Sequence, residues 1–148
     1  MMKPPIFPPP PSGTAAQQYM HRARMFRKAA MRLVDSSNGE QFLPKYALLT
    51  HAIELSLKAF AFHSVEAGKP ERRVPNHDLR GWYQLAIQYG LRADPTITKN
   101  INHLHELHFS HYMRYPQEAT TPVSDLSVIA DSTVDYLIDS FTPLINPS

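Results

Sequence analysis

The chain contains 148 residues, of which 43% are hydrophobic and 19% are charged, and these values fit a single domain with a sizeable core. It has no cysteine, which excludes disulfide bonds, thiolate metal ligands and a cysteine nucleophile. No apolar run approaches the roughly 18 residues that cross a bilayer, and the first residues lack a signal-peptide pattern, so we expect a cytoplasmic protein with no membrane partner.

The formal net charge of +2 does not by itself indicate nucleic-acid binding, but the charges are unevenly distributed. Residues 1–35 include six Lys or Arg and one acidic residue, whereas residues 115–148 include five acidic residues and no Lys or Arg. Two interpretations are open. Either the first and last helices lie close together, within one chain or across a dimer, or the basic first helix meets an acidic partner or a phosphate backbone.

Residues 1–13, MMKPPIFPPPPSG, are rich in proline, which cannot donate helix hydrogen bonds and favours an extended polyproline conformation. We therefore expect a disordered or arm-like tail in front of one helical domain at residues 14–148. Docking of this tail would need a partner.

The first helix is expected from about Thr14 to Ser36. One of its faces carries apolar residues at helical spacing, namely Tyr19, Ala23, Phe26, Ala30 and Leu33. Another face carries a basic stripe of His21, Arg24, Lys28 and Arg32. From this stripe we take Arg24, Lys28 and Arg32 as candidate RNA-binding residues.

The second helix is expected from Pro44 to about Gly68, because proline is tolerated in a first turn and glycine is common just past a helix end. Its apolar residues cover more than half of the circumference, with Tyr46, Leu49, Ile53, Leu57 and Phe60 on one side and Leu48, Ala52, Leu55, Ala59 and Phe62 on another. A helix that is apolar nearly all round is expected at the centre of its bundle.

The next two helices are predicted from their capping residues. Asn76 is predicted as the N-cap of a helix that Gly90 closes, with Asp78 favourably placed in the first turn. Asp94 and Pro95 predict the start of the following helix, as N-cap and first helical residue.

This fourth helix is expected to run to about Tyr112 and to end before Pro116. Ser124 is predicted to cap the last helix. Because no segment alternates like a strand for long, we expect an all-α fold, a compact bundle of about five helices.

The second and third helices carry a recognisable pattern. AIELSLKA at residues 52–59, a Gly-containing break, HDL at residues 77–79 and a helix ending in YG resemble the HEPN domain superfamily. The resemblance implies an up-and-down four-helix core plus one short helix, over roughly residues 15–142. Many members are RNases of prokaryotic toxin–antitoxin and defence systems, so it also implies a homodimer and a nucleotidyltransferase-type antitoxin partner.

The superfamily's RNase motif, an Arg followed after four to six residues by a His near the start of a late helix, is missing from its expected place. Such a His would move a proton of the ribose 2′-hydroxyl, and the Arg would hold the phosphate. The helix at Pro95 has no Arg before its histidines, and Lys99 with His103 is no equivalent because lysine does not grip phosphate as arginine does. Arg72 and His77 have the spacing but lie in the loop before the third helix. The usual catalytic residues are therefore not carried over.

Glu54, Lys58, His77 and Asp78 have a structural interpretation. Glu54 precedes Lys58 by four residues, which is the favourable order for an ion pair on a helix. Both lie in the most apolar helix, where the pair is either partly buried or reaches the surface. His77 is expected at a helix start, bonded to Glu54 or to backbone.

Residues 103–116, HLHELHFSHYMRYP, contain four of the chain's eight histidines. The apolar stripe of this helix advances by four, three, four and three residues through Ile97, Ile101, Leu104, His108 and His111. We therefore expect His108 and His111 on the continuation of the core face.

Three interpretations of these histidines remain open. In the first, His108 and His111 are buried polar residues satisfied by their neighbours. In the second, they line a cleft with Arg114 and Tyr115 that suits RNA or a phosphate-bearing ligand. In the third, His105, His108 and His111 bind a metal ion in adjacent pairs, with further ligands from another helix.

The leading functional hypothesis is a HEPN-like binding or assembly module without catalysis, with RNA as one candidate partner and no cofactor. The alternative is a divergent, metal-independent endoribonuclease with His108 or His111 as acid–base group and Arg114 as phosphate clamp. A third hypothesis is a nucleotide- or small-ligand-binding domain that uses the same cleft.

Overall fold

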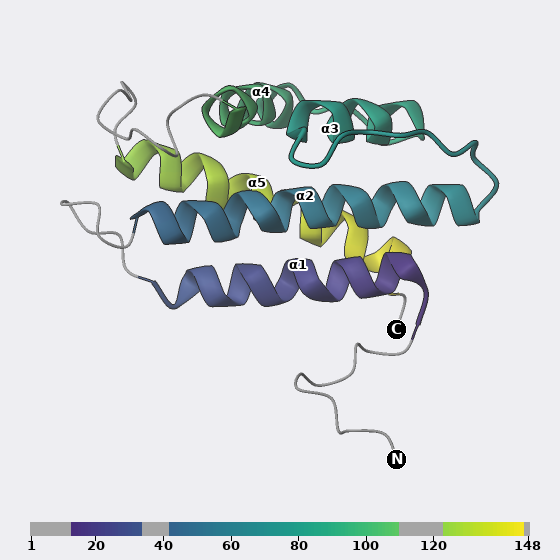
Figure 1. The fold of residues 1–148 in the computed structure, drawn as a ribbon, viewed down its shortest axis with the longest axis horizontal. Coiled ribbons are helices and arrows are strands. Elements are labelled where there is room, and N and C mark those ends of the chain that lie inside the picture. Colours follow the sequence, from purple (N-terminus) through teal and green to yellow (C-terminus); the bar gives the residue numbers. More distant parts are fainter. Residues whose placement is uncertain (1–12, 34–41, 110–122, 147–148) are drawn as a thin grey trace, which may run out of the picture.

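The structure is a computed structural model that describes residues 13–33, 42–109 and 123–146, the side chains of residues 42–43, 107–109 and 123–127 excepted. These residues form five helices and contain no strand: α1 (Ala15–Met31), α2 (Phe42–Glu66), α3 (Leu79–Gln88), α4 (Pro95–Phe109) and α5 (Val123–Ile145). Figure 1 shows α1 alongside α2, with α5 behind them and with α3 and α4 in a further layer. The expected all-α bundle is confirmed. Among the helices so described, none combines the length and the apolar character that a membrane crossing requires.

Helix α1 begins at a capping box. The Thr14 hydroxyl accepts a hydrogen bond from the Gln17 N–H at 3.1 Å, and the Gln17 side chain accepts one from the Thr14 N–H at 3.0 Å, so that two otherwise unpaired donors are satisfied. The predicted end at Ser36 is too late, because the last turn tightens at Arg32, whose N–H reaches the Ala29 carbonyl at 3.2 Å.

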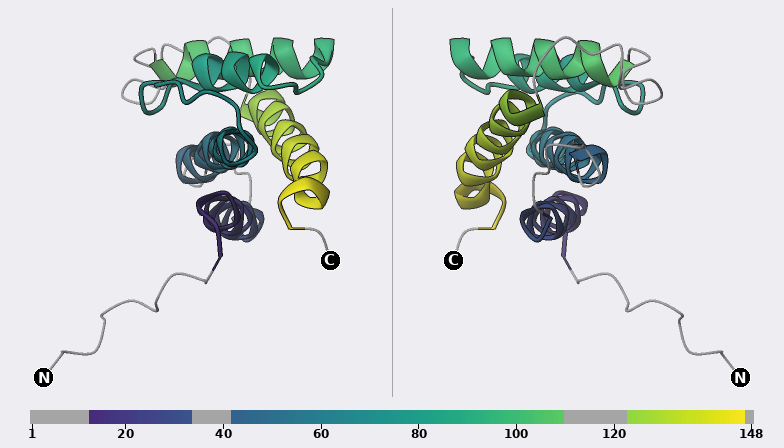
Figure 2. Two further views of the ribbon diagram at one scale, coloured as in Figure 1. Left: turned by 90° about the vertical axis from the view of Figure 1, so that its right-hand side faces the viewer. Right: turned by 90° about the vertical axis from the view of Figure 1, so that its left-hand side faces the viewer.

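Helix α2 is the central helix, as its all-round apolar pattern predicts. Its fully buried large residues, Tyr46, Leu49, Ile53 and Leu57, pack in one core with residues from the other four helices. The helix stops where expected, since Gly68 adopts a φ of 108° and the Lys69 N–H returns to the Ser64 carbonyl at 3.0 Å. Figure 2 shows α1 and α2 side by side and nearly end-on, with α5 inclined beside them and α4 running across.

The caps of α3 and α4 test two predictions. The prediction for α4 is confirmed, because Asp94 Oδ1 accepts from the Ile97 N–H at 3.0 Å and Pro95 is the first helical residue. The prediction of Asn76 as the cap of α3 is wrong, since the N-cap is Asp78, whose Oδ1 accepts from the Gly81 N–H at 2.9 Å. Both residue types suit an N-cap, and the side chain of Asn76 is engaged elsewhere.

Helix α5 lies against α1 and brings the acidic end of the chain to the basic one. Arg27 Nη1 lies 3.3 Å from Asp135 Oδ1 and 3.9 Å from Asp139 Oδ1. The interpretation that the first and last helices lie close together within one chain is therefore confirmed. Ser124, predicted as the cap of the last helix, lies inside α5, which begins at Val123.

Candidate functional site

Four of the residues in the segments that carry the family resemblance, Glu54, Lys58, His77 and Asp78, meet where α2, α3 and α4 join. Together with the neighbours that they contact or that continue the contact to α4, they form a cluster that we call the polar junction. It consists of Glu54, Lys58, Asn76, His77, Asp78, Arg80, Asn102, His105 and Glu106. The loop between α2 and α3 runs back along α2 in Figure 1, and this return brings residues 76–78 beside the middle of that helix. The helical spacing of Glu54 and Lys58 places both side chains on the side of α2 that faces this loop.

Glu54 is the buried centre of the polar junction, with only 3% of its side chain exposed. Its Oε2 lies 2.8 Å from Lys58 Nζ and its Oε1 lies 3.1 Å from His77 Nδ1. Burial acts to raise the pKa of Glu54, but the hydrogen bonds and charges of Lys58 and His77 outweigh it, and the pKa is lowered from its ordinary value. Glu54 is therefore a buried carboxylate held in its charged form by its two partners.

Lys58 is held from three sides. Besides Glu54, its Nζ donates to Asn76 Oδ1 at 3.0 Å and lies 5.4 Å from the centre of the Trp82 ring, within the range of a cation–π contact. The ion pair is thus a buried one, with 13% of the Lys58 side chain exposed. The hydrogen bond from Lys58 to Asn76 was not predicted, and the only sign of it in the sequence is that Asn76 precedes His77.

His77 has an unusual backbone conformation. Its φ of 68° makes it the one non-glycine residue with a positive φ in the described part of the chain, a conformation that costs energy for most residues but is tolerated by histidine more than by bulky ones. The turn allows His77 to approach α2 while the next residue, Asp78, caps α3. The His77 side chain is 64% exposed, and a neutral ring that donates from Nδ1 to Glu54 carries its basic nitrogen at Nε2.

Asp78 links α3 to α4 through His105. Asp78 Oδ1 lies 3.4 Å from His105 Nδ1, and the same nitrogen lies 3.3 Å from the backbone N of Arg80. Burial, together with the charge of Arg80, lowers the pKa of His105. The neutral ring that accepts from the Arg80 N–H has no hydrogen on Nδ1, whereas a protonated ring carries one there and donates it to Asp78.

Arg80 completes the contact between α3 and α4. Its Nε donates to Asn102 Oδ1 at 2.9 Å, and its Nη2 lies 3.5 Å from Glu106 Oε1. Asn102, His105 and Glu106 share one edge of α4, beside the apolar stripe of Ile101 and Leu104. Sequence reasoning missed this edge, although its spacing of three and four residues is a helical one.

A further half-buried histidine, His51, lies one turn before Glu54 on α2. Its ring packs edge-on against Phe26 of α1, with the ring centres 4.4 Å apart. Burial lowers the pKa of His51, against the opposing effect of the Glu54 carboxylate. Its neutral form is therefore favoured inside the bundle.

Of the three candidate RNA-binding residues of the first helix, one packs against α5 and two are exposed. Arg24 Nη2 donates to Thr142 Oγ1 of α5 at 2.9 Å, so Arg24 contributes to packing between the two helices. Lys28 and Arg32 are exposed. They accompany two exposed methionines, Met25 and Met31, which are 56% and 71% exposed.

The residues of the predicted histidine site fall largely outside the described part of the chain. This holds for the side chain of His108 and for His111, Arg114 and Tyr115 as a whole, so the predicted cleft and its catalytic roles stay predictions. His105 belongs to the polar junction. Within the described residues, no three His, Asp or Glu side chains come together as metal ligands would.

Comparison of the chain with protein-family models, with curated proteins and with solved structures finds no match.

Proposed function

We propose that this chain is a HEPN-like helical module that works by binding and assembling with a partner, without catalysis at the residues that carry the resemblance. The observation that supports this most is the polar junction. Glu54 and Lys58 bind each other and the loop before α3, and Asp78 caps α3 and lies beside His105. A catalytic lysine or carboxylate needs to reach a substrate, whereas Lys58 Nζ is held by Glu54 at 2.8 Å and by Asn76 at 3.0 Å.

The outer face of α1 is the surface we assign to binding. Lys28 and Arg32 give it positive charge, and Met25 and Met31 give it exposed apolar side chains that adapt to different partners. Such a face suits an anionic partner, and RNA is the one that we propose. A second copy of the chain and a nucleotidyltransferase-type antitoxin, in a prokaryotic toxin–antitoxin or defence setting, are the other partners that the resemblance implies.

The test measures binding and cleavage of a labelled mixed RNA pool by the purified full-length chain, with a chelator present. We expect binding without cleavage, and an affinity that falls steeply between about 50 and 200 mM salt because phosphate contacts release counterions. The double variant Lys28→Ala/Arg32→Ala should bind more weakly. The double variant Arg92→Ala/Lys99→Ala removes the same charge from exposed positions elsewhere and should bind like the wild type.

Two results would overturn the proposal. Cleavage by the wild type that His111→Ala and Arg114→Ala both abolish would establish the divergent RNase instead. Binding that does not change with salt, or that both double variants weaken equally, would exclude α1 as the phosphate-binding surface. Light scattering on the same samples tests the homodimer, and a monomer at every concentration would contradict it.

A further inference from the structure

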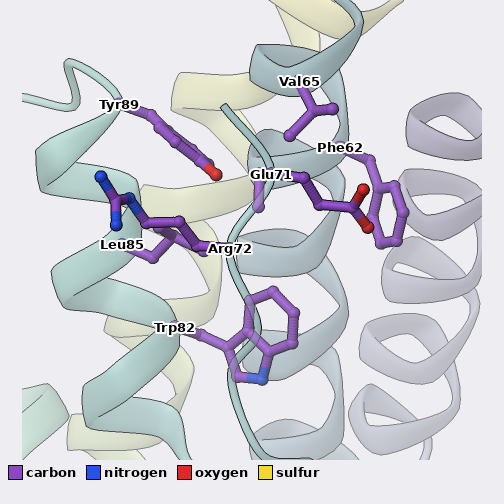
Figure 3. Close-up of a pocket in the computed structure, with 8 residues that line it drawn as sticks. Phe62, Val65, Glu71, Arg72, Trp82, Leu85 and Tyr89 are labelled. Atoms are coloured by element: carbon purple, nitrogen blue, oxygen red, sulfur yellow. The ribbon is translucent and has the colours of Figure 1, made fainter. Parts of the chain in front are cut away.

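A small apolar pocket opens between α2 and α3, next to the loop that connects them. Figure 3 shows its lining side chains: α2 contributes Ala61, Phe62 and Val65, α3 and its C-cap contribute Trp82, Leu85 and Tyr89, and the loop contributes Glu71 and Arg72. The polar junction lies further towards the start of both helices. The pocket therefore lies beside the polar junction, and Trp82, which contacts Lys58, lies at the boundary between them.

The size of the pocket limits what can enter it. Its volume is about 50 Å³, which is room for about three to five water-sized probes. A nucleobase or another fused ring system is too large to be enclosed in this space. A single proline ring or a short aliphatic side chain is of suitable size.

The lining of the pocket suits proline in particular. Phe62, Trp82 and Tyr89 provide three aromatic side chains around a small apolar space, and aromatic-lined grooves are the usual binding sites of proline-rich segments in the polyproline conformation. Such segments lose little conformational entropy on binding because they are already extended. Glu71 and Arg72 also line the pocket, and Figure 3 shows the Glu71 carboxylate on the Phe62 side and the Arg72 guanidinium on the opposite side. A basic residue next to the prolines would be favourable on the Glu71 side.

The chain has a segment with this chemistry at residues 1–12, outside the described residues. It contains Lys3-Pro4-Pro5, and then the run Pro8–Pro11. In sequence it therefore combines a basic residue directly followed by two prolines with a second run of four prolines.

The start of α1 places this segment within reach of the pocket. Tyr19 of α1 stacks on Phe62, with the ring centres 5.1 Å apart, and Thr14 lies only about 7.5 Å before Tyr19 along the helix at 1.5 Å per residue. In the polyproline conformation, which rises 3.1 Å per residue, eight residues such as 6–13 would span about 25 Å. Figure 1 shows the first turn of α1 and the last turns of α2 at the same end of the bundle.

From this geometry we propose that the proline-rich segment docks in the pocket of its own chain, with Pro4-Pro5 between the aromatic side chains and Lys3 beside Glu71. The segment is then an intramolecular ligand of the pocket. Another protein's proline-rich segment would have to displace it. This proposal does not depend on the proposed function of α1 or of the polar junction.

The absence of cysteine from the chain allows a direct test. The variant Met2→Cys of the full-length protein accepts a single nitroxide spin label, which broadens the NMR signals of nearby amides. We expect broadening at the amides of Ala61, Val65 and Leu85 and not at Asp135 on α5. The broadening should not depend on protein concentration, because the contact is within one chain.

Matched variants on the labelled protein test the register. Pro4→Ser/Pro5→Ser should remove the broadening at the pocket, whereas Pro10→Ser/Pro11→Ser removes two prolines from the spacer and should retain most of it. Lys3→Glu and Glu71→Lys should each weaken the broadening, and their combination should restore it.

Several outcomes would overturn the proposal. One is an absence of broadening at the pocket in the labelled parent protein. Another is an equal response of the two double-proline variants. Broadening that appears only when a spin-labelled chain is mixed with an unlabelled, isotope-enriched one would assign the pocket to the segment of a second copy instead.

Discussion

Glu54 is the residue on which most of the polar junction depends. Its carboxylate faces Lys58 at 2.8 Å and His77 at 3.1 Å while almost wholly buried. Replacing Glu54 with Ala should lower the free energy of unfolding by about 3–5 kcal/mol, because it leaves the ammonium group of Lys58 buried without its counter-ion. Urea denaturation measures this change.

A double-mutant cycle separates the pair from the cavity that the substitution creates. Glu54→Ala/Lys58→Met removes both charges, so its loss of stability should be clearly smaller than the sum of the two single losses. Additive losses would mean that the two side chains do not stabilise each other.

The three lowered pKa values of the junction and its surroundings predict a loss of stability in acid. His51 and His105 have lower pKa values in the folded protein than their ordinary 6.5, so the unfolded chain binds more protons as the pH falls through that value. Their contribution is complete above about 6.5 and decreases below it. Glu54, whose pKa is lowered from its ordinary 4.5, adds a second loss when the pH falls below that value.

Urea denaturation across this pH range checks the prediction. The free energy of unfolding should fall in two stages, and His105→Gln should reduce the slope of the first stage while the Glu54 stage remains. A free energy of unfolding that rises as the pH is lowered from about 7 to 5 would have the opposite sign and would contradict the assignment.

Gly81 is required by the cap of α3. A Cβ atom at this position would lie 2.4 Å from Asp78 Oδ2 and 2.9 Å from Val74 Cγ1. Gly81→Ala should therefore destabilise the protein by about 1–3 kcal/mol through overpacking, although alanine is the better helix former. Thermal denaturation compares it with Gln84→Ala at an exposed position of the same helix, which should be near neutral.

At the scale of the elements, α3 and α4 start with the same kind of cap but in different settings. Among the described residues the Asp94 side chain serves as the cap of α4, whereas Asp78 caps α3 and lies beside His105 of α4. Asp94→Ala should cost about 1 kcal/mol, the typical value for an N-cap. Asp78→Ala should lower the free energy of unfolding by more than Asp94→Ala does, because it removes the cap and also changes the contact with α4.

The measurement is the free energy of unfolding of both variants at neutral and at acidic pH. As His105 becomes protonated, the loss of unfolding free energy caused by Asp78→Ala should increase, since a charged ring would pair with the Asp78 carboxylate. The loss caused by Asp94→Ala should stay the same. Equal costs at both pH values would mean that Asp78 acts as a cap alone.

The sequence predicts the helices well where the pattern is periodic and less well where the choice is local. The helix start near Thr14 and the cap at Asp94 follow from residue types that satisfy open N–H groups. Asn76 and Asp78 are both good caps two residues apart, and the choice between them depends on Lys58, which binds Asn76. That contact joins α2 to the loop before α3, so helix-capping preferences alone do not reveal it.

For the molecule as a whole, the pattern of α2 predicts its central position because an all-round apolar helix has to be covered on all sides. The opposite charges of the two chain ends likewise correspond to the packing of α1 against α5. The relative positions of α3 and α4 have no such signal. The contacts of Arg80 with Asn102 and Glu106 depend on how these two helices pack, which single-helix periodicity does not determine.

The candidate site was only partly predictable for the same reason. The spacing of Glu54 and Lys58 predicts their contact within one helix, and a bond from His77 to Glu54 was one of two options. The pairing of Asp78 with His105 joins residues that are 27 positions apart in the sequence. This pairing depends on the left-handed turn at His77, and no pattern in the sequence predicts that turn.

Residues 77–79 bind the two layers of the bundle together at one point: His77 contacts α2, Asp78 contacts α4 and Leu79 is fully buried. The α3–α4 pair is therefore a unit that can open as a whole when this point fails. Native-state hydrogen exchange should show the amides of α3 and α4 exchanging together and before those of α1 and α2. Protonation of Glu54 should speed up exchange in the first group and leave the second protected, so that acid would detach one layer of the protein before it unfolds the rest.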